Sequence, residues 1–316
     1  MVSNLIFCLN ATMPIFIMMI IGYLFRKYNI ISEQFTKEMN SFVFKIALPV
    51  LVFNELAGEN FSDIWDTGFV IFCFVVTVLQ ITISAIFSIV SKKVDDNAEF
   101  IQASFRSSAA LLGVGIVQNL YGEAGFVPLM IVGAVPLYNI TAVSLLSILK
   151  PEKNESLSKE VLKKTLFGII TNPIILGIIV GFLWSIFKIP RPFIFERTTT
   201  YIGNLATPLG LMALGASLDF KSIGNKVFSV VSATTFKLVI FCMLFIPVAL
   251  QFGYRKDKLL AILIMLGSPT TVSSFVMARS MGHDGQTSAG TVMLSTLFSA
   301  FTLTLWLFIL KSADFI

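Results

Sequence analysis

The sequence predicts an all-α integral membrane protein of ten transmembrane helices, arranged as two inverted repeats of five. Three observations predict this class: an apolar composition, ten apolar stretches of membrane-spanning length, and a motif that recurs in the second half of the chain. Hydrophobic residues make up 56% of the 316 residues and charged residues only 13%. This balance leaves too little polar surface to cover a soluble globule of this length.

Ten stretches are long enough to cross a membrane. The hydrocarbon core is about 30 Å thick and requires about 20 helical residues. The stretches run approximately over 5–25, 35–57, 67–91, 100–119, 124–149, 165–187, 195–218, 226–251, 258–280 and 286–310. Basic residues follow the first stretch but none precedes it, so we expect no cleaved signal peptide and a multi-pass protein of the cell membrane.

A proline motif indicates an internal duplication. Thr12-Met13-Pro14-Ile15 is followed by Gly22, and 159 residues later Thr171-Asn172-Pro173-Ile174 is followed by Gly181. Chance similarity within an apolar chain is the alternative explanation. A duplicated membrane unit is typical of secondary transporters, whose substrate site lies between the two halves.

The same shift carries Pro49 onto Pro208, although the chain has only 11 prolines. Because each half holds five spans, the second half is expected to sit upside down relative to the first. We predict a first repeat over 1–149, a polar cytoplasmic linker over 150–164 and a second repeat over 165–316.

The distribution of lysine and arginine predicts the orientation. With the N-terminus outside, 13 basic residues fall in inside loops and 7 fall in outside loops or near the C-terminus. The inside excess predicts that both termini lie outside.

Three basic residues remain within predicted spans: Lys45, Arg106 and Lys237. The acidic residues fall almost entirely in loops or at span ends, with Glu55 the nearest exception. Unpaired buried charge is costly, so a net positive interior predicts an anionic substrate such as a carboxylate. The lack of membrane carboxylates also argues against a dedicated Asp/Glu proton relay or a carboxylate-rich sodium site.

Each of these cations also has a simpler interpretation. Arg106 lies near one end of its span, where its side chain can snorkel to the cytoplasmic surface. Lys237 can hydrogen-bond to carbonyl groups at a helix end. Lys45 maps onto Asn204 by the same 159-residue shift, which makes these two residues candidates at matching points of the two halves.

Spans four and nine are poor continuous helices. Glycine interrupts residues 105–115, and Gly267-Ser268-Pro269 interrupts span nine. In lipid such breaks persist where they line a cavity, and a helix that begins after Pro269 would point its N–H groups at an anion. A proline kink with close helix packing is the alternative.

Several motifs occur in an order that resembles the auxin efflux carrier family. They are Phe105-Arg106-Ser107-Ser108, Gly113-Val114-Gly115, Leu120-Tyr121-Gly122, Val135-Pro136-Leu137-Tyr138-Asn139, Asn172-Pro173-Ile174, Pro208-Leu209, Gly215-Ala216-Ser217-Leu218 and Ser268-Pro269-Thr270. The resemblance covers essentially the whole chain. It is closest to the prokaryotic branch, whose members are often described as malonate or other organic acid transporters.

The resemblance implies that the unwound helices four and nine cross at the membrane midplane. It also implies a homodimer in which a transport domain, spans three to five and eight to ten, moves as an elevator against a scaffold of the other four spans. Lys45 and Asn204 would face the moving domain from the scaffold. One departure is that Ser108 stands where the family often has asparagine, and that Gly113-Val114-Gly115 lacks the family's crossover proline.

We therefore predict a secondary transporter of small organic anions such as dicarboxylates, with the substrate held where spans four and nine cross. Arg106 or Lys237 would neutralise its charge or stand in for a coupling cation. The predicted substrate-binding residues are Arg106, Ser108, Gly113, Gly115, Tyr138, Asn139, Lys237, Ser268, Pro269, Thr270 and Thr271. A ligand sensor or a channel on the same fold is the alternative.

Other classes lack sequence support. The adjacent acids Asp95-Asp96 have no further spaced acids of the kind that a magnesium-diphosphate site requires, so we expect no enzyme. Cys8, Cys73 and Cys242 are interpreted as packing residues, and His283 as a solvated loop residue. We expect no cofactor, no metal and no nucleic-acid partner.

Overall fold

A computed structural model describes residues 2–57, 65–108, 117, 126–149, 167–168 and 170–316, and the described elements are all helices. The first half contains α1 (Val2–Lys27), α2 (Glu33–Phe42), η1 (Val43–Ala47), α3 (Leu48–Ala57), α4 (Thr67–Ser91), α5 (Asn97–Phe105) and α7 (Val127–Ile148). The second half contains α9 (Pro173–Ile186), α10 (Phe193–Asn204), α11 (Ala206–Ala216), α12 (Phe220–Asn225), α13 (Val227–Thr235), η2 (Phe236–Ile240), α14 (Phe241–Gln251), α15 (Lys256–Gly267), α16 (Ser273–Ser280) and α17 (Gln286–Ser312). The predicted all-helical class is confirmed for these residues.

Side-chain caps fix several helix starts. Asp66 accepts from the N–H of Phe69 at the start of α4, and Asp96 accepts from the N–H of Glu99 at the start of α5. Asn172 caps α9, which begins with a proline at its first position. These side chains satisfy N–H groups that have no partner within the helix, so short polar residues next to apolar runs mark the helix boundaries.

The helix α4 buries polar residues and exposes apolar ones, the reverse of a surface helix in a soluble protein. Its polar residues Gln80 and Ser84 are buried, whereas Ile86 and Ile89 are 57% and 71% exposed. An apolar outer face is what a surrounding of lipid tails requires. Within the described part of the chain, five continuous helical segments are long and apolar enough to cross a membrane: 33–57, 67–91, 127–148, 227–251 and 286–312. The count of ten spans and their inverted arrangement remain predictions.

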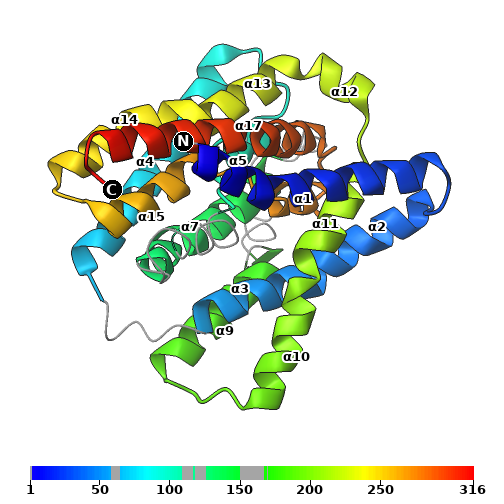
Figure 1. Ribbon diagram of the computed structural model, residues 1–316. Helices are drawn as coiled ribbons and strands as arrows, with labels where there is room; N and C mark the ends of the chain where they lie inside the picture. Colours follow the sequence, from blue (N-terminus) through cyan, green and yellow to red (C-terminus); the bar gives the residue numbers. More distant parts are fainter. Residues whose placement is uncertain (1, 58–64, 109–116, 118–125, 150–166, 169) are drawn as a thin grey trace.

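The helices pack around two hydrophobic cores. One core is formed by α4, α5, α7, α13, α14, α15 and α17. The second is formed by α1, α2, η1, α3, α9, α11 and α16, together with parts of α7 and α17. In Figure 1, α1, α2, α3, α9, α10 and α11 occupy the right and lower parts of the molecule, α4, α14 and α15 lie at the left, and α13 lies at the top.

Several helices are interrupted where the two cores meet. Between α15 and α16, residues 268–272 are not helical, and α5 ends at Phe105. The π-helical segments η1 and η2 interrupt two further helices, with Lys45 and Lys237 in them. Such π-helical insertions widen a helix locally and are frequent at functional sites.

Candidate binding site at two helix breaks

The ends of α5 and α15 lie against each other. Beyond α5 the backbone is extended at Arg106, and beyond α15 it is extended at Ser268. The N–H of Ser108 donates to the carbonyl oxygen of Pro269 at 2.9 Å. The Thr270 hydroxyl donates to the carbonyl oxygen of Ala103 at 2.7 Å. Backbone groups that lose their helical partners at the two breaks therefore hydrogen-bond from one break to the other. Irregular backbone at membrane depth needs such bonds, because no lipid tail can satisfy a polar group.

A cavity of about 60 Å³ adjoins this junction. Its polar wall includes Arg106, Ser108, Tyr138, Asn139 and Thr271, five of the residues that the sequence predicts for the substrate site. Because a single water molecule requires about 10–15 Å³ by a comparable measure, the cavity holds a few waters or part of a small solute. The remaining lining residues are Leu48, Leu51, Val52, Glu55, Ser107, Val135, Ile174, Thr207, Val272 and Ser273.

Arg106 is the cation of this cavity. Its side chain is buried and donates from Nη2 to Asn139 Oδ1 at 2.9 Å and to Ser273 Oγ at 2.7 Å, while Nη1 lies 2.9 Å from Met277 Sδ. Among the described residues, no hydrogen-bond partner contacts its Nε and no carboxylate lies within ion-pair distance. The side chain therefore does not snorkel to the surface, and its charge faces neutral partners.

The start of α16 borders the same cavity. Thr271, Val272 and Ser273 line it, and α16 begins at Ser273. The first N–H groups of a helix carry partial positive charge, which favours an anion. The hydroxyl groups of Thr271 and Ser273 lie next to the start of α16, with their oxygens 3.2 Å apart. The site offers an arginine, a helix start and neutral hydrogen-bonding groups.

Lys237 binds the end of α15, where the break between α15 and α16 begins. Its ammonium group is completely buried and donates to the carbonyl oxygens of Met265 and Leu266, at 3.0 and 2.8 Å. These carbonyls end α15, where the helix dipole places partial negative charge. Lys237 is not among the residues that line the cavity. Its geometry matches the simpler interpretation, a hydrogen bond to helix-end carbonyls.

The other predicted site residues have different positions. Ser268 and Thr270 are buried at the junction and do not line the cavity. Pro269 accepts the hydrogen bond from Ser108 through its carbonyl. Gly113 and Gly115 lie outside the described residues. Lys45 is exposed and borders a second cavity, and Asn204 is exposed at the end of α10 and borders neither cavity.

Glu55 and Ser273 are cavity residues that were not predicted. Glu55 lies on α3 and lines the cavity together with Arg106 and the start of α16. The sequence signal for Glu55 was its position inside an apolar stretch. Ser273 accepts a hydrogen bond from Arg106, and its signal was the hydroxyl-rich segment that follows Pro269.

A second cavity of about 930 Å³ lies between α1, α2, η1 and α11 on one side and α16 on the other. Its basic lining residues are Arg26, Lys37, Lys45 and Arg279. Its acids are Glu33 and Asp219, and Glu33 pairs with both Arg26 and Lys37. The formal charge of this lining is therefore positive.

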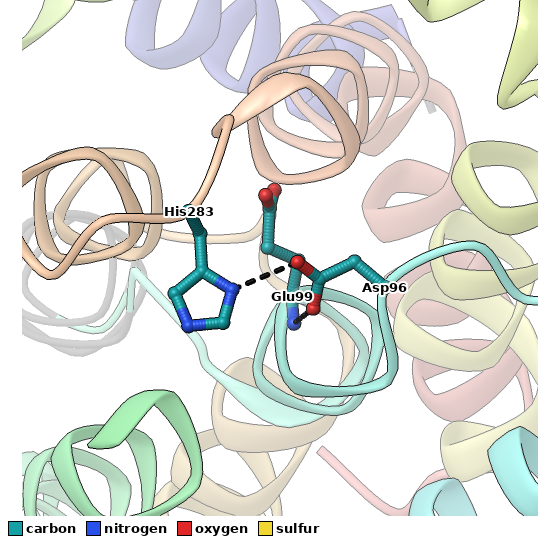
Figure 2. Close-up of side chains that lie close together, drawn as sticks. All are labelled: Asp96, Glu99 and His283. Atoms are coloured by element: carbon teal, nitrogen blue, oxygen red, sulfur yellow. Dashed lines mark hydrogen bonds and ion pairs between the residues drawn. The ribbon is translucent and has the colours of Figure 1, made fainter. Parts of the chain in front are cut away.

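His283 corrects the prediction of a solvated loop residue. Its side chain is fully buried, with Nδ1 2.8 Å from Asp96 Oδ2 and Nε2 3.0 Å from the carbonyl oxygen of Leu146. Figure 2 shows the imidazole directed at Asp96, with Glu99 beside the pair. Both ring nitrogens face acceptors, so the doubly protonated imidazolium satisfies both.

Burial lowers the pKa of His283, but the hydrogen bonds to Asp96 and Leu146 and the charges of Asp96 and Glu99 outweigh it, and the net pKa is raised. Glu99 is buried, and its two carboxylate oxygens accept from the N–H groups of Gly285 and Ser288 at 2.7 and 2.8 Å. Asp96, Glu99 and His283 have the composition of a metal site. Each ligand atom already has a hydrogen-bond partner, so the group forms a latch between α5, α7 and the start of α17.

The fold and site define a helical membrane protein with a small polar cavity at two helix breaks. The chain matches the family model for membrane transport proteins over residues 7–307. It belongs to that family, which confirms the family resemblance of the motifs.

Three relatives agree with this assignment. An uncharacterized transporter of Methanothermobacter thermautotrophicus is 19% identical over 301 residues, covering 94% of this chain and 96% of the relative. An uncharacterized transporter of Methanocaldococcus jannaschii is 22% identical over 314 residues, covering 96% and 98%. A protein of Rhizobium meliloti, provisionally named a malonate transporter, is 20% identical over 312 residues, covering 96% of each chain.

Proposed function

We propose that this membrane transporter is a secondary carrier of small organic anions such as dicarboxylates. The observation that carries the proposal is Arg106, a buried cation on a cavity wall whose hydrogen-bond partners are neutral. A buried guanidinium whose hydrogen-bond partners are neutral is free to pair directly with a substrate carboxylate. A substrate carboxylate would accept from Arg106 and from the N–H groups that begin α16.

The two cations at the breaks have different roles in this proposal. Arg106 would contact the substrate. Lys237 would hold the end of α15 in place, because its ammonium group bonds the last carbonyls of that helix. It would supply there the positive charge that a coupling cation supplies in other carriers.

The second cavity supports the anionic assignment. It carries more basic than acidic residues, and Phe44 and Lys45 on its wall directly precede the segment of α3 that lines the first cavity. A positively charged cavity next to the site raises the local concentration of anions. We propose that anions enter the site along η1 from the cytoplasmic side.

The proposed mechanism is elevator-type alternating access in a homodimer of the cell membrane, with both termini outside. The core of α4, α5, α7, α13, α14, α15 and α17 corresponds to the proposed transport domain. The other core joins α1, α3, α9 and α11 of the proposed scaffold to α16 of the proposed transport domain, and Lys45 on η1 and Asn204 on α10 belong to spans of the proposed scaffold. The cavity lies between helices of both groups, where relative movement would change its access.

Uptake into sealed proteoliposomes tests this proposal. Labelled malonate, malate and lactate are offered to the parent protein and to Arg106→Met and Pro269→Ala. We expect saturable uptake of at least one acid by the parent, and a loss of about tenfold or more in both variants. An exposed change, Lys311→Met, is the matched control and is expected to match the parent.

The alternatives give different results. Uptake that does not saturate and shows no counterflow would indicate a channel. Binding of the acids without flux would indicate a sensor. Equal flux in the parent and Arg106→Met, or transport restricted to neutral or cationic solutes, would overturn the anion assignment.

A further inference from the structure

Glu55 is a carboxylate in the lining of the cavity that contains Arg106. It belongs to α3, whereas Arg106 follows α5, and both line the 60 Å³ cavity. The lining also includes apolar residues, among them Leu48, Val52 and Ile174. A carboxyl group in such surroundings is stable either opposite a cation or in its protonated form.

Among the described residues of the cavity lining and of the helices packed against α3, Arg106 is the buried cation that can balance the charge of Glu55. Among the described residues that line the cavity, Tyr138 is the only other titratable one. Glu55 also lies on the helix that packs against α9, α10, η1 and α7, and Tyr138 is the titratable residue of α7. The segment α9 contains no titratable residue. The titratable residues of α10, Glu196, Arg197 and Tyr201, are exposed, and Lys45 of η1 is exposed and borders the second cavity.

We propose that Glu55 is the residue that couples anion transport to a proton. This inference rests on the proposed function. In the empty site the carboxylate of Glu55 balances the guanidinium of Arg106. When a substrate carboxylate binds Arg106, Glu55 accepts one proton, and that proton leaves when the substrate leaves. One proton then moves with each negative charge that binds at Arg106.

Charge balance in a small cavity is the physical reason. Arg106 and Glu55 together are neutral, so an added anion would leave a net negative charge in a volume that holds only a few waters. Protonation of Glu55 restores neutrality at the moment of binding. The two sites titrate as a pair, so substrate and proton affinities raise each other.

Gradient-driven uptake and counterflow separate this role from a structural one. Proteoliposomes containing the parent, Glu55→Gln or Glu38→Gln are given labelled malonate, malate or lactate, with and without an acid-outside proton gradient. Glu38 is an exposed acid of α2 outside both cavities, which makes it the matched control. Gel filtration before reconstitution reports whether each variant is folded.

We expect the gradient to raise parent and Glu38→Gln uptake several-fold and to leave Glu55→Gln uptake at its gradient-free level. Counterflow needs no net proton movement, so it should remain detectable in Glu55→Gln. If Glu55→Gln does not fold, Glu55→Asp is used, and the pH at which its uptake is half-maximal should differ from that of the parent.

Four results would overturn the inference. Gradient stimulation of Glu55→Gln equal to that of the parent, or an unchanged pH profile in Glu55→Asp, would exclude Glu55 while leaving the proposed function intact. Saturable anion uptake by the parent at the same rate with and without the proton gradient would also exclude this role of Glu55 and leave the proposed function intact. Absence of both uptake and counterflow for all three acids in the parent would remove the proposed function and this inference with it.

Discussion

Gly22 and Gly181 occupy equivalent positions in the packing of two helix pairs. Gly22 on α1 lies against the backbone of Met212 on α11, and Gly181 on α9 lies against the backbone of Phe53 on α3. The two glycines are 159 residues apart, and so are Phe53 and Met212. Each half of the chain therefore contributes one partner to each contact, which supports the proposed duplication.

These contacts predict that Gly22→Leu and Gly181→Leu destabilise the protein. A Cβ atom at Gly22 would overlap the carbonyl oxygen of Met212, and one at Gly181 would lie 3.2 Å from that of Phe53. Overpacking at such sites costs about 1–3 kcal/mol, so a lower melting temperature is expected for both, with the larger loss at Gly22. Thermal melting in detergent, followed by fluorescence-detected gel filtration, measures it.

Gly224→Leu is the control, because nothing lies within 4 Å of a Cβ atom built there. A melting temperature for Gly22→Leu as high as that of Gly224→Leu would contradict this account of the contact.

Much of the fold could be predicted from local sequence. Helix starts follow Asp66, Asp96 and Asn172, because each is a polar cap next to an apolar run. The break after Gly267 followed from Gly-Ser-Pro within one apolar stretch. Hydropathy and capping are properties of neighbouring residues, so a single sequence contains them.

The site could be predicted only where a residue carried its own signal. Arg106 was a charge in an apolar span, and Ser108 and Thr271 lay at expected breaks. The burial of His283 comes from Asp96 and Leu146, which are distant in the chain, whereas its sequence neighbours Gly282 and Asp284 indicated a solvated loop. That Glu55 lines the same cavity as Arg106 likewise depends on tertiary packing.

Lys237→Met is predicted to lower stability and transport together. The substitution removes the donor from two buried carbonyls, of Met265 and Leu266, at a cost of about 1–3 kcal/mol for each acceptor that stays unsatisfied. Because Lys237 does not line the cavity, we expect a lower maximal rate with little change in KM. Melting temperature and concentration-dependent uptake are measured on the same preparations.

Lys237→Arg provides the comparison, since it keeps the charge and can restore part of the lost stability. A rise in KM for Lys237→Met at an unchanged maximal rate would instead place Lys237 in contact with the substrate.

Arg106→Lys is predicted to impair anion uptake although it keeps the positive charge. The guanidinium bonds Asn139 and Ser273 from one planar group, and an ammonium cannot match this geometry while it also binds a carboxylate. We expect KM to rise by about tenfold, which corresponds to about 1.4 kcal/mol of binding free energy.

Arg197→Lys, an exposed change on α10, should leave KM unchanged. Equal KM values for Arg106→Lys and Arg197→Lys would show that the geometry of Arg106 does not matter for binding.

The latch at His283 predicts that stability falls as the pH becomes alkaline. The pKa of His283 is raised above its ordinary value of 6.5, with burial opposed by the hydrogen bonds and charges around it. A histidine whose pKa is higher in the folded state stabilises the fold fully below its unfolded pKa, and this contribution is lost as the pH rises through the folded pKa. The melting temperature of the parent should therefore decline above about pH 6.5, at the pH values where the raised group loses its proton.

Two variants identify the group responsible. In His283→Gln the decline should be shallower and the melting temperature lower at about pH 6, because glutamine has no charge to lose. In Asp96→Asn the N-cap of α5 is retained, since asparagine also caps helices, but the counter-charge of the imidazolium is removed. The decline should then shift to lower pH. If the parent and His283→Gln decline with the same slope over this range, another group is responsible, and the latch contributes no pH dependence.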